Sequence, residues 1–190
     1  MKKHYSSSAV LSPLSRENVE AAERLYLSAF PEEERRDVGE WLRLSAENPL
    51  FHLCELTAGG AFAGILTYWA FPLSLEKGET DFFYIEHFAT LPELRGRGLG
   101  AAALKAFASV AQGRPTVLEV EPPQTETARR RVGFYRRAGF ELLEIPYTQP
   151  PYRPGGEHVP LCLMCTDAAY ALSHSARIVA TLHREVYGVR

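Results

Sequence analysis

The feature that most constrains this chain is a glycine-rich turn, Arg95-Gly96-Arg97-Gly98-Leu99-Gly100. The segment before it, 81–90, is rich in aromatic residues and is typical of a buried strand. The segment after it places Leu99, Ala102, Ala103, Ala106 and Val110 on one face of a predicted helix. A helix N-terminus presents N–H groups and partial positive charge, and glycines let a ligand approach the backbone. This order therefore predicts a cradle for a phosphate group.

Other readings of the turn are less satisfactory. A P-loop needs a Lys followed by Ser or Thr, and neither pair follows the glycines. A Rossmann fingerprint needs G-x-G-x-x-G near the first strand, whereas the glycines here are spaced G-x-G-x-G. The remaining alternative is a strand-to-helix turn whose glycines serve packing alone. The three alternating glycines and the two arginines, Arg95 before them and Arg97 between them, favour the phosphate site.

The rest of the chain predicts alternating helices and strands. Residues 1–12 read as a loose lead-in or a short first strand, and 72–80 as a polar loop. We expect one helix that begins after Ser15 and ends before Pro31, and another with its apolar face from Leu99 to Val110. We also expect helices over 32–46, 124–138 and 167–187. We expect strands over 50–57, 61–71, 81–90, 116–120, 140–145 and 158–165. Crossovers in the middle and hairpins at the sides predict an α/β (mixed α+β) fold, with one mixed sheet and helices on both faces.

Composition excludes several classes of protein. The chain has 190 residues, and 21 Lys and Arg against 23 Asp and Glu give a formal net charge of −2. This balance argues against general nucleic-acid or membrane-surface binding. No apolar run is long enough to span a bilayer, and the N-terminus lacks the apolar core of a signal peptide. The three cysteines (Cys54, Cys162 and Cys165) suggest buried thiols, so we expect a cytoplasmic protein without a metal site.

Two motifs together resemble one family. Arg95, Gly98 and Gly100 fill the pattern R-x-x-G-x-G, which resembles the acetyl-CoA signature of the GNAT superfamily of N-acetyltransferases. The run 133–140 (GFYRRAGF) is similar to that family's second landmark, a Tyr near the end of a helix. The resemblance covers roughly residues 15–165. It implies a mostly antiparallel sheet of about six to seven strands with a parallel, splayed pair. It also implies a single domain over 1–166 with a C-terminal helical extension, 167–190.

The resemblance implies acetyl-CoA as co-substrate and assigns the residues that bind it. The turn would hold the pyrophosphate, and the backbone of the preceding strand would pair with the pantetheine arm. These cofactor-binding residues are Phe88, Ala89, Thr90, Arg95, Gly96, Arg97, Gly98, Leu99, Gly100, Ala101 and Tyr135. The sequence departs from the family's pattern at two places. It has Thr90 where Val is usual, and Glu121-Pro122-Pro123 where many members place an Asn.

Acetyl transfer to an amine needs a base, because a free alkylamine has a pKa of about 10.4. Glu119 and Glu86 match family positions that carry a base, and Glu121 is a third candidate. We rank Glu119 slightly above Glu86, with a hydrogen-bonded strand carboxylate as the alternative for each. Tyr135 matches the family's Tyr that protonates the leaving thiolate, with core packing as its alternative. His87 alternates with Glu86 and is taken as a core or surface histidine.

Other segments bear on the acceptor. The proline-rich loop 146–157 carries Tyr147, Gln149 and Tyr152, which we expect to line the acceptor site, with a structural connection as the alternative. The acidic run 32–34 would attract an amine or simply open a helix. The basic residues within 129–137 form a solvated helix face or contact the cofactor's outer phosphate.

We therefore expect an acetyl-CoA-dependent N-acetyltransferase acting on a primary amine of a small molecule or peptide by direct attack in a ternary complex. The alternative is a non-catalytic acyl-CoA-binding module of the same fold. A third reading is an interaction protein that uses the apolar stripe of 167–187 to form a homodimer.

Overall fold

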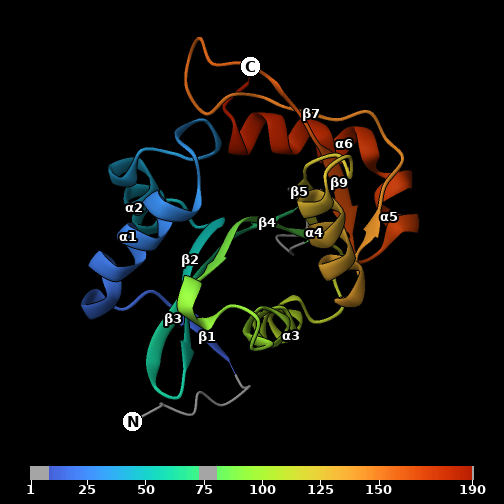
Figure 1. Cartoon of the computed structure of the whole chain (residues 1–190). Coiled ribbons are helices and arrows are strands. Elements are labelled where there is room, and N and C mark those ends of the chain that lie inside the picture. Colours follow the sequence, from blue (N-terminus) through green and yellow to red (C-terminus); the bar gives the residue numbers. More distant parts are fainter. Residues whose placement is uncertain (1–8, 73–80, 190) are drawn as a thin grey trace. The chain divides into compact units, whose positions relative to one another are not determined.

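The computed structural model describes residues 9–72 and 81–189. The lead-in 1–8 and nearly all of the expected polar loop 72–80 lie outside the described residues. The helices, labelled in Figure 1 where there is room, are α1 Val19–Ala29, α2 Val38–Glu47, α3 Leu99–Ala111, α4 Glu126–Arg137, α5 Ala168–Ser173 and α6 Ser175–Thr181. Short 3₁₀ turns are η1 Arg16–Asn18, η2 Glu32–Glu34 and η3 Pro92–Leu94, and η4 Leu182–Val186 is a π-helix.

One seven-stranded sheet has the hydrogen-bonded order β1-β2-β3-β4-β5-β9-β6, and a second, two-stranded sheet is formed by β7 and β8. The larger sheet is mostly antiparallel with one parallel pair, which confirms the expected fold class. The strands are β1 Val10–Pro13, β2 Phe51–Ala58, β3 Ala61–Phe71, β4 Phe82–Thr90, β5 Thr116–Val120, β6 Glu141–Leu142, β7 Thr148–Gln149, β8 Val159–Pro160 and β9 Cys162–Cys165. No helix in the described ranges is both long and apolar enough to cross a bilayer.

The chain divides into two compact units, and the first comprises residues 9–32, 37–70 and 85–113. Its centre is the antiparallel hairpin β2–β3, which begins at the pair Phe51↔Trp69 and closes at Ala58↔Ala61. Every residue from Ala63 to Trp69 is buried, so both faces of β3 are covered. In Figure 1, α2 lies beside β2, against which it packs, and α3 packs against β1.

The second unit comprises residues 33–36, 71–72, 81–84 and 114–189. Strand β9 lies between β5 and β6 and is antiparallel to both, with Val117 and Glu141 both opposite Cys165. Helix α4 begins where the Thr125 hydroxyl accepts a hydrogen bond from the Ala128 N–H over 3.0 Å. Helix α5 packs against β9.

The C-terminal stripe is largely covered within the chain. Of its six apolar residues, Ala171, Ile178, Leu182 and Val186 are at most 2% exposed, whereas Leu172 is 51% exposed. The stripe therefore does not need a second subunit to be buried.

Four predicted elements were wrong in extent. The helix expected from Glu32 begins at Val38, because Asp37 caps it by accepting from the Gly39 N–H over 2.8 Å. The strand expected over 140–145 is only Glu141–Leu142.

The last strand, expected over 158–165, breaks after Pro160. That proline cannot donate to a ladder, and the chain changes from pairing with β7 to pairing with β5 and β6. The helix expected over 167–187 is interrupted at His174, whose Nδ1 and the neighbouring Ser173 hydroxyl both lie 2.9 Å from the Tyr170 carbonyl.

Candidate functional site

The glycine turn has the geometry that a phosphate cradle needs. Gly96 and Gly98 adopt φ of 75° and 78°, and a Cβ built on either would meet nothing within 4 Å. Backbone conformation therefore requires these glycines, and packing does not. Gly98 is the N-cap of α3 and supplies no side chain to cap it, so the first N–H groups of a 13-residue helix are not capped by a side chain. Gly98 and both arginines of the turn are exposed, and these residues fit a pyrophosphate group.

The end of β4, just before the turn, is held close to β3. A Cβ on Gly64 would lie 2.5 Å from the Ala89 carbonyl oxygen and 3.1 Å from the Thr90 Cα. Only a glycine admits this approach. The Leu91 N–H donates to the Ala63 carbonyl over 2.9 Å. Phe88 and Thr90 are half-buried and Ala89 is 9% exposed. The end of the strand that we expect to pair with the pantetheine arm is therefore packed against its neighbours.

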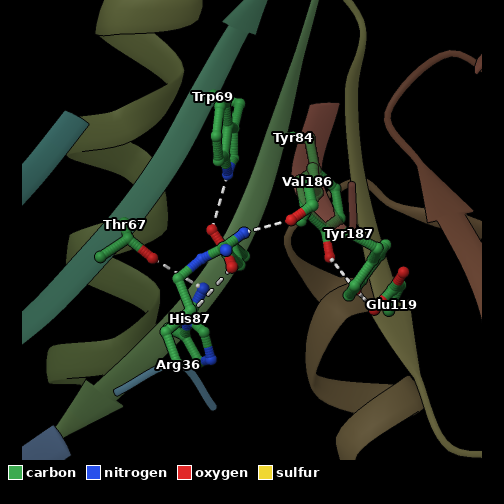
Figure 2. Close-up of polar contacts among 9 residues, drawn as sticks. Arg36, Thr67, Trp69, Tyr84, His87, Glu119, Val186 and Tyr187 are labelled. Carbon is green, nitrogen blue, oxygen red and sulfur yellow. Dashed lines mark hydrogen bonds and ion pairs between the residues drawn. The ribbon is translucent and has the colours of Figure 1, made fainter. Parts of the chain in front are cut away.

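Glu86 is a fully buried carboxylate in the first unit. Its side chain is 0% exposed, and Oε2 accepts a hydrogen bond from Trp69 Nε1 over 2.6 Å. His87 is 2% exposed and packs edge-on against Tyr26, with ring centroids 5.0 Å apart. The backbone N–H of His87 donates to the Thr67 hydroxyl over 3.0 Å, as the dashed line in Figure 2 shows. His87 is thus a core histidine, one of the two expected settings.

Glu119 is surrounded by tyrosine hydroxyls in the second unit. Tyr147 donates a hydrogen bond to Oε1 of Glu119, and Tyr187 donates to Oε2 over 2.8 Å. The hydroxyl oxygens of Tyr84 and Tyr187 are 3.2 Å apart. Figure 2 shows Tyr84, Tyr187 and Glu119 in this arrangement. Burial, followed by the Glu119 charge, raises the pKa values of both Tyr147 and Tyr187, so these phenols keep their protons and remain donors.

Tyr135 lies near the end of α4 with its ring against Phe134 and Phe140, at centroid distances of 5.1 and 5.7 Å. Desolvation raises its pKa to about 12, and the nearby Arg131 charge opposes that rise. Tyr135 is therefore a neutral hydroxyl at physiological pH.

The basic run of α4 has protein partners. Arg131 pairs with Glu121 over 2.6 Å, and Arg129 donates to the Gln124 carbonyl over 2.8 Å. Arg130 pairs with Glu126 one helical turn away. These contacts favour the solvated helix face over a phosphate contact. They also engage Glu121, the third candidate base, in an ion pair.

The residues expected to line the acceptor site differ in exposure. Tyr147 is 7% exposed and Gln149 4%, so neither presents an open wall. Tyr152 is half-buried, and its ring centroid lies 5.0 Å from that of Tyr187. The guanidinium carbon of Arg36 lies over the Tyr152 ring, 5.0 Å from its centroid. Arg36 also donates to the Val186 carbonyl (Figure 2).

Three residues around the two carboxylates were not predicted as site residues: Trp69, Tyr84 and Tyr187. Trp69 contacts Glu86 and Tyr187 contacts Glu119, whereas Tyr84 reaches Glu119 through the Tyr187 hydroxyl. All three are distant in sequence from the carboxylate concerned, and no local motif identifies them. The C-terminal position of Tyr187, beyond an apolar stripe, carried no signal of its own. Within the residues described, no cluster of three or more His, Cys, Asp or Glu is placed to hold a metal ion.

Comparisons with known proteins agree on the family. The profile of the acetyltransferase (GNAT) family matches residues 16–140. A GNAT-family protein from Bacteroides thetaiotaomicron is 36% identical, with a TM-score of 0.83, over 95% of this chain and 99% of that one. Naa50 of Arabidopsis thaliana, in complex with a bisubstrate analogue, is 18% identical with a TM-score of 0.58, covering 83% and 97% of the two chains.

The ribosomal-protein-S18-alanine N-acetyltransferase of Escherichia coli is 19% identical with a TM-score of 0.57, over 83% of this chain and 92% of that one. At these identities the last two likenesses concern the fold alone. A comparison with curated proteins finds no match. The family profile and the 36% identical structure, together with the glycine turn, show that this chain belongs to the GNAT family of acetyltransferases.

Proposed function

We propose that the protein transfers an acetyl group from acetyl-CoA to a primary amine of a small molecule or peptide, by direct attack in a ternary complex. The observation that carries the proposal is the turn at 95–100, whose two positive-φ glycines open an exposed helix N-terminus directly after a buried strand. Acetyl-CoA supplies the activated acetyl group as a thioester. The turn suits the pyrophosphate of acetyl-CoA because backbone N–H groups and two exposed arginines can bind the same anion.

Glu119 is our proposed base. A carboxylate that removes a proton from an ammonium must pass that proton onward, and hydroxyls can both donate and accept. The hydroxyls of Tyr147 and Tyr187 are both hydrogen-bonded to Glu119. At Glu86, the Trp69 indole on Oε2 can only donate, and the His87 ring nitrogen Nδ1 lies 3.9 Å from Oε1, beyond hydrogen-bond distance. This difference supports Glu119 over Glu86. Glu121 is disfavoured by its ion pair with Arg131.

Tyr135 is our proposed partner of the leaving thiolate. Thiols have pKa values of about 8.5, so a thiolate is a weaker base than the anion of a phenol whose pKa is about 12. Complete proton transfer from Tyr135 to the thiolate is then uphill. We infer that Tyr135 stabilises the leaving sulfur by donating a hydrogen bond and keeps its proton.

The acceptor is proposed as an amine class. One solved structure of the same fold is that of a ribosomal-protein-S18-alanine N-acetyltransferase, and another holds the bisubstrate analogue CoA-Ac-MVNAL. These two structures support a peptide amine among the candidates. A small-molecule amine is equally compatible with the fold, because acceptor sites vary while a fold is kept.

The test is thiol release from acetyl-CoA with a panel of N-terminal peptides, polyamines and amino-sugars, followed by mass spectrometry of the products. We expect a product heavier by one acetyl group with at least one class of amine. A non-catalytic module would instead show thermal stabilisation by acetyl-CoA with no thiol release above the amine-free rate. That result would exclude the proposed function and favour the alternative.

A further inference from the structure

We propose that Tyr187, in the C-terminal segment, is a positioning residue that orients the Glu119 carboxylate for catalysis. The inference rests on the proposed role of Glu119 as the base. It extends the catalytic machinery beyond residues 16–140, which match the family profile, to the end of the described chain.

The Glu119 carboxylate is held at both of its oxygens. Each oxygen of Glu119 accepts a hydrogen bond from a different phenol, Oε1 from Tyr147 and Oε2 from Tyr187. The terminal torsion of a Glu side chain is broad, so a single donor leaves the carboxylate plane poorly defined. One donor on each oxygen fixes that plane. A general base works only when its free lone pair points at the proton to be removed.

The hydrogen bonds that Tyr187 makes with Glu119 and Tyr84 run in one direction. A tyrosine hydroxyl has one proton, and that of Tyr187 is directed at Glu119. At the 3.2 Å contact with Tyr84, Tyr187 therefore accepts and Tyr84 donates. The hydrogen bonds thus run from Tyr84 through Tyr187 to Glu119, and both hydroxyls point their protons toward the carboxylate. Such chains strengthen each bond by polarisation.

An unusual backbone turn places Tyr187. The π-helix η4 ends just before it, and the Tyr187 N–H reaches back five residues to the Leu182 carbonyl over 3.3 Å. Single π-turns are uncommon and occur frequently at functional sites. The buried Arg36 guanidinium donates to the Val186 carbonyl and so holds the end of this turn.

The same turn also holds the other donor. His183, in η4, donates from Nε2 to the Thr148 carbonyl over 3.0 Å, and its ring lies 5.6 Å from that of Tyr147. Since the Thr148 carbonyl is an acceptor only, the His183 nitrogen must carry the proton. One turn of π-helix thus places Tyr187 and braces the segment that carries Tyr147. These contacts give the C-terminal segment a role in the site, in addition to its role in packing.

The test is a double-mutant cycle between Tyr187→Phe and Glu119→Gln, with Tyr170→Phe as the matched control. Tyr170 lies in the same C-terminal segment, and its hydroxyl has no hydrogen-bond partner among the described residues. We expect Tyr187→Phe to lower kcat about tenfold with the KM for acetyl-CoA unchanged. In the Glu119→Gln background, Tyr187→Phe should not lower kcat any further, because the carboxylate that Tyr187 orients is already absent. Tyr170→Phe should match the wild type.

Several outcomes overturn the inference separately from the proposed function. A tenfold loss that persists in the Glu119→Gln background shows that Tyr187 acts by packing. Wild-type kcat in Tyr187→Phe, with an active parent enzyme, excludes the positioning role alone. A parent enzyme that acetylates no amine excludes the proposed function and this inference with it. If Tyr187→Phe does not fold, as judged by thermal unfolding, Tyr84→Phe replaces it, and its loss of kcat must likewise disappear with Glu119→Gln.

Discussion

The indole Nε1 of Trp69 lies 2.6 Å from Oε2 of Glu86 and donates a hydrogen bond to that buried carboxylate. A hydrogen bond to a buried charge contributes more than an ordinary one, about 1.5–3 kcal/mol. This bond links the end of β3 to the middle of β4 within the first unit.

Trp69→Phe removes this donor and should lower the free energy of unfolding by more than the packing loss alone. Trp41→Phe is the matched control, because Trp41 is also fully buried and its Nε1 has no hydrogen-bond partner among the described residues. Urea denaturation of both variants measures the difference, which we expect to be about 1.5–3 kcal/mol. Equal losses would show that the indole–carboxylate bond contributes nothing net.

Gly64→Ala should destabilise the protein by about 2 kcal/mol or more. The new Cβ would lie 2.5 Å from the Ala89 carbonyl oxygen, and backbone cannot move aside as a flexible side chain can. Gly133→Ala is the control with the opposite sign. Gly133 lies inside α4, where a Cβ would meet nothing closer than Arg137 at 3.5 Å. It should gain about 0.5–1 kcal/mol from helix propensity. Denaturant midpoints of the two variants decide, and a tolerated Gly64→Ala would contradict the close approach of β3 to β4.

Gly98→Ala should weaken acetyl-CoA binding. Its φ of 78° costs an alanine about 1–2 kcal/mol, and relief of that strain would rotate the first N–H groups of α3. Gly155→Ala carries similar strain at φ 81°, also with no atom within 4 Å of its Cβ, in the loop between β7 and β8. We expect both variants to lose similar stability. Calorimetry should show at least a tenfold rise in the Kd for acetyl-CoA for Gly98→Ala alone. Unchanged affinity would favour a turn that serves packing only.

Tyr135→Phe should lower kcat about 10- to 100-fold, the effect of losing one hydrogen bond to a developing thiolate. The ring contacts with Phe134 and Phe140 remain, so the affinity for acetyl-CoA should be nearly unchanged. Because the Tyr135 pKa is about 12, the wild-type hydroxyl stays protonated throughout pH 6–10. The shape of the pH–rate profile over that range should therefore be the same in the variant. Steady-state kinetics at several pH values provide the measurement, and unchanged kcat would remove Tyr135 from the mechanism.

Short-range patterns predicted much of this protein. The hairpin around Gly59 and Gly60, the buried strand 81–90 and the helix after Gly98 occupy nearly the expected residues. Each depends on periodicity or turn chemistry within about ten residues. One error arose where a longer-range choice decides, because the chain leaves one strand pairing for another after Pro160. Another arose locally: a hydrogen bond at His174 ends a helix that the apolar stripe predicted to continue.

The candidate site divides in the same way. From the sequence alone came the glycine turn, Tyr135 in its helix and two strand carboxylates as possible bases, because each belongs to a local motif. What surrounds those carboxylates was decided by the tertiary structure. Glu119 receives its two phenols from 28 and 68 residues away, and Glu86 receives its indole from 17 residues away. Partners at such separations are selected by the packing of whole elements, which no local pattern encodes.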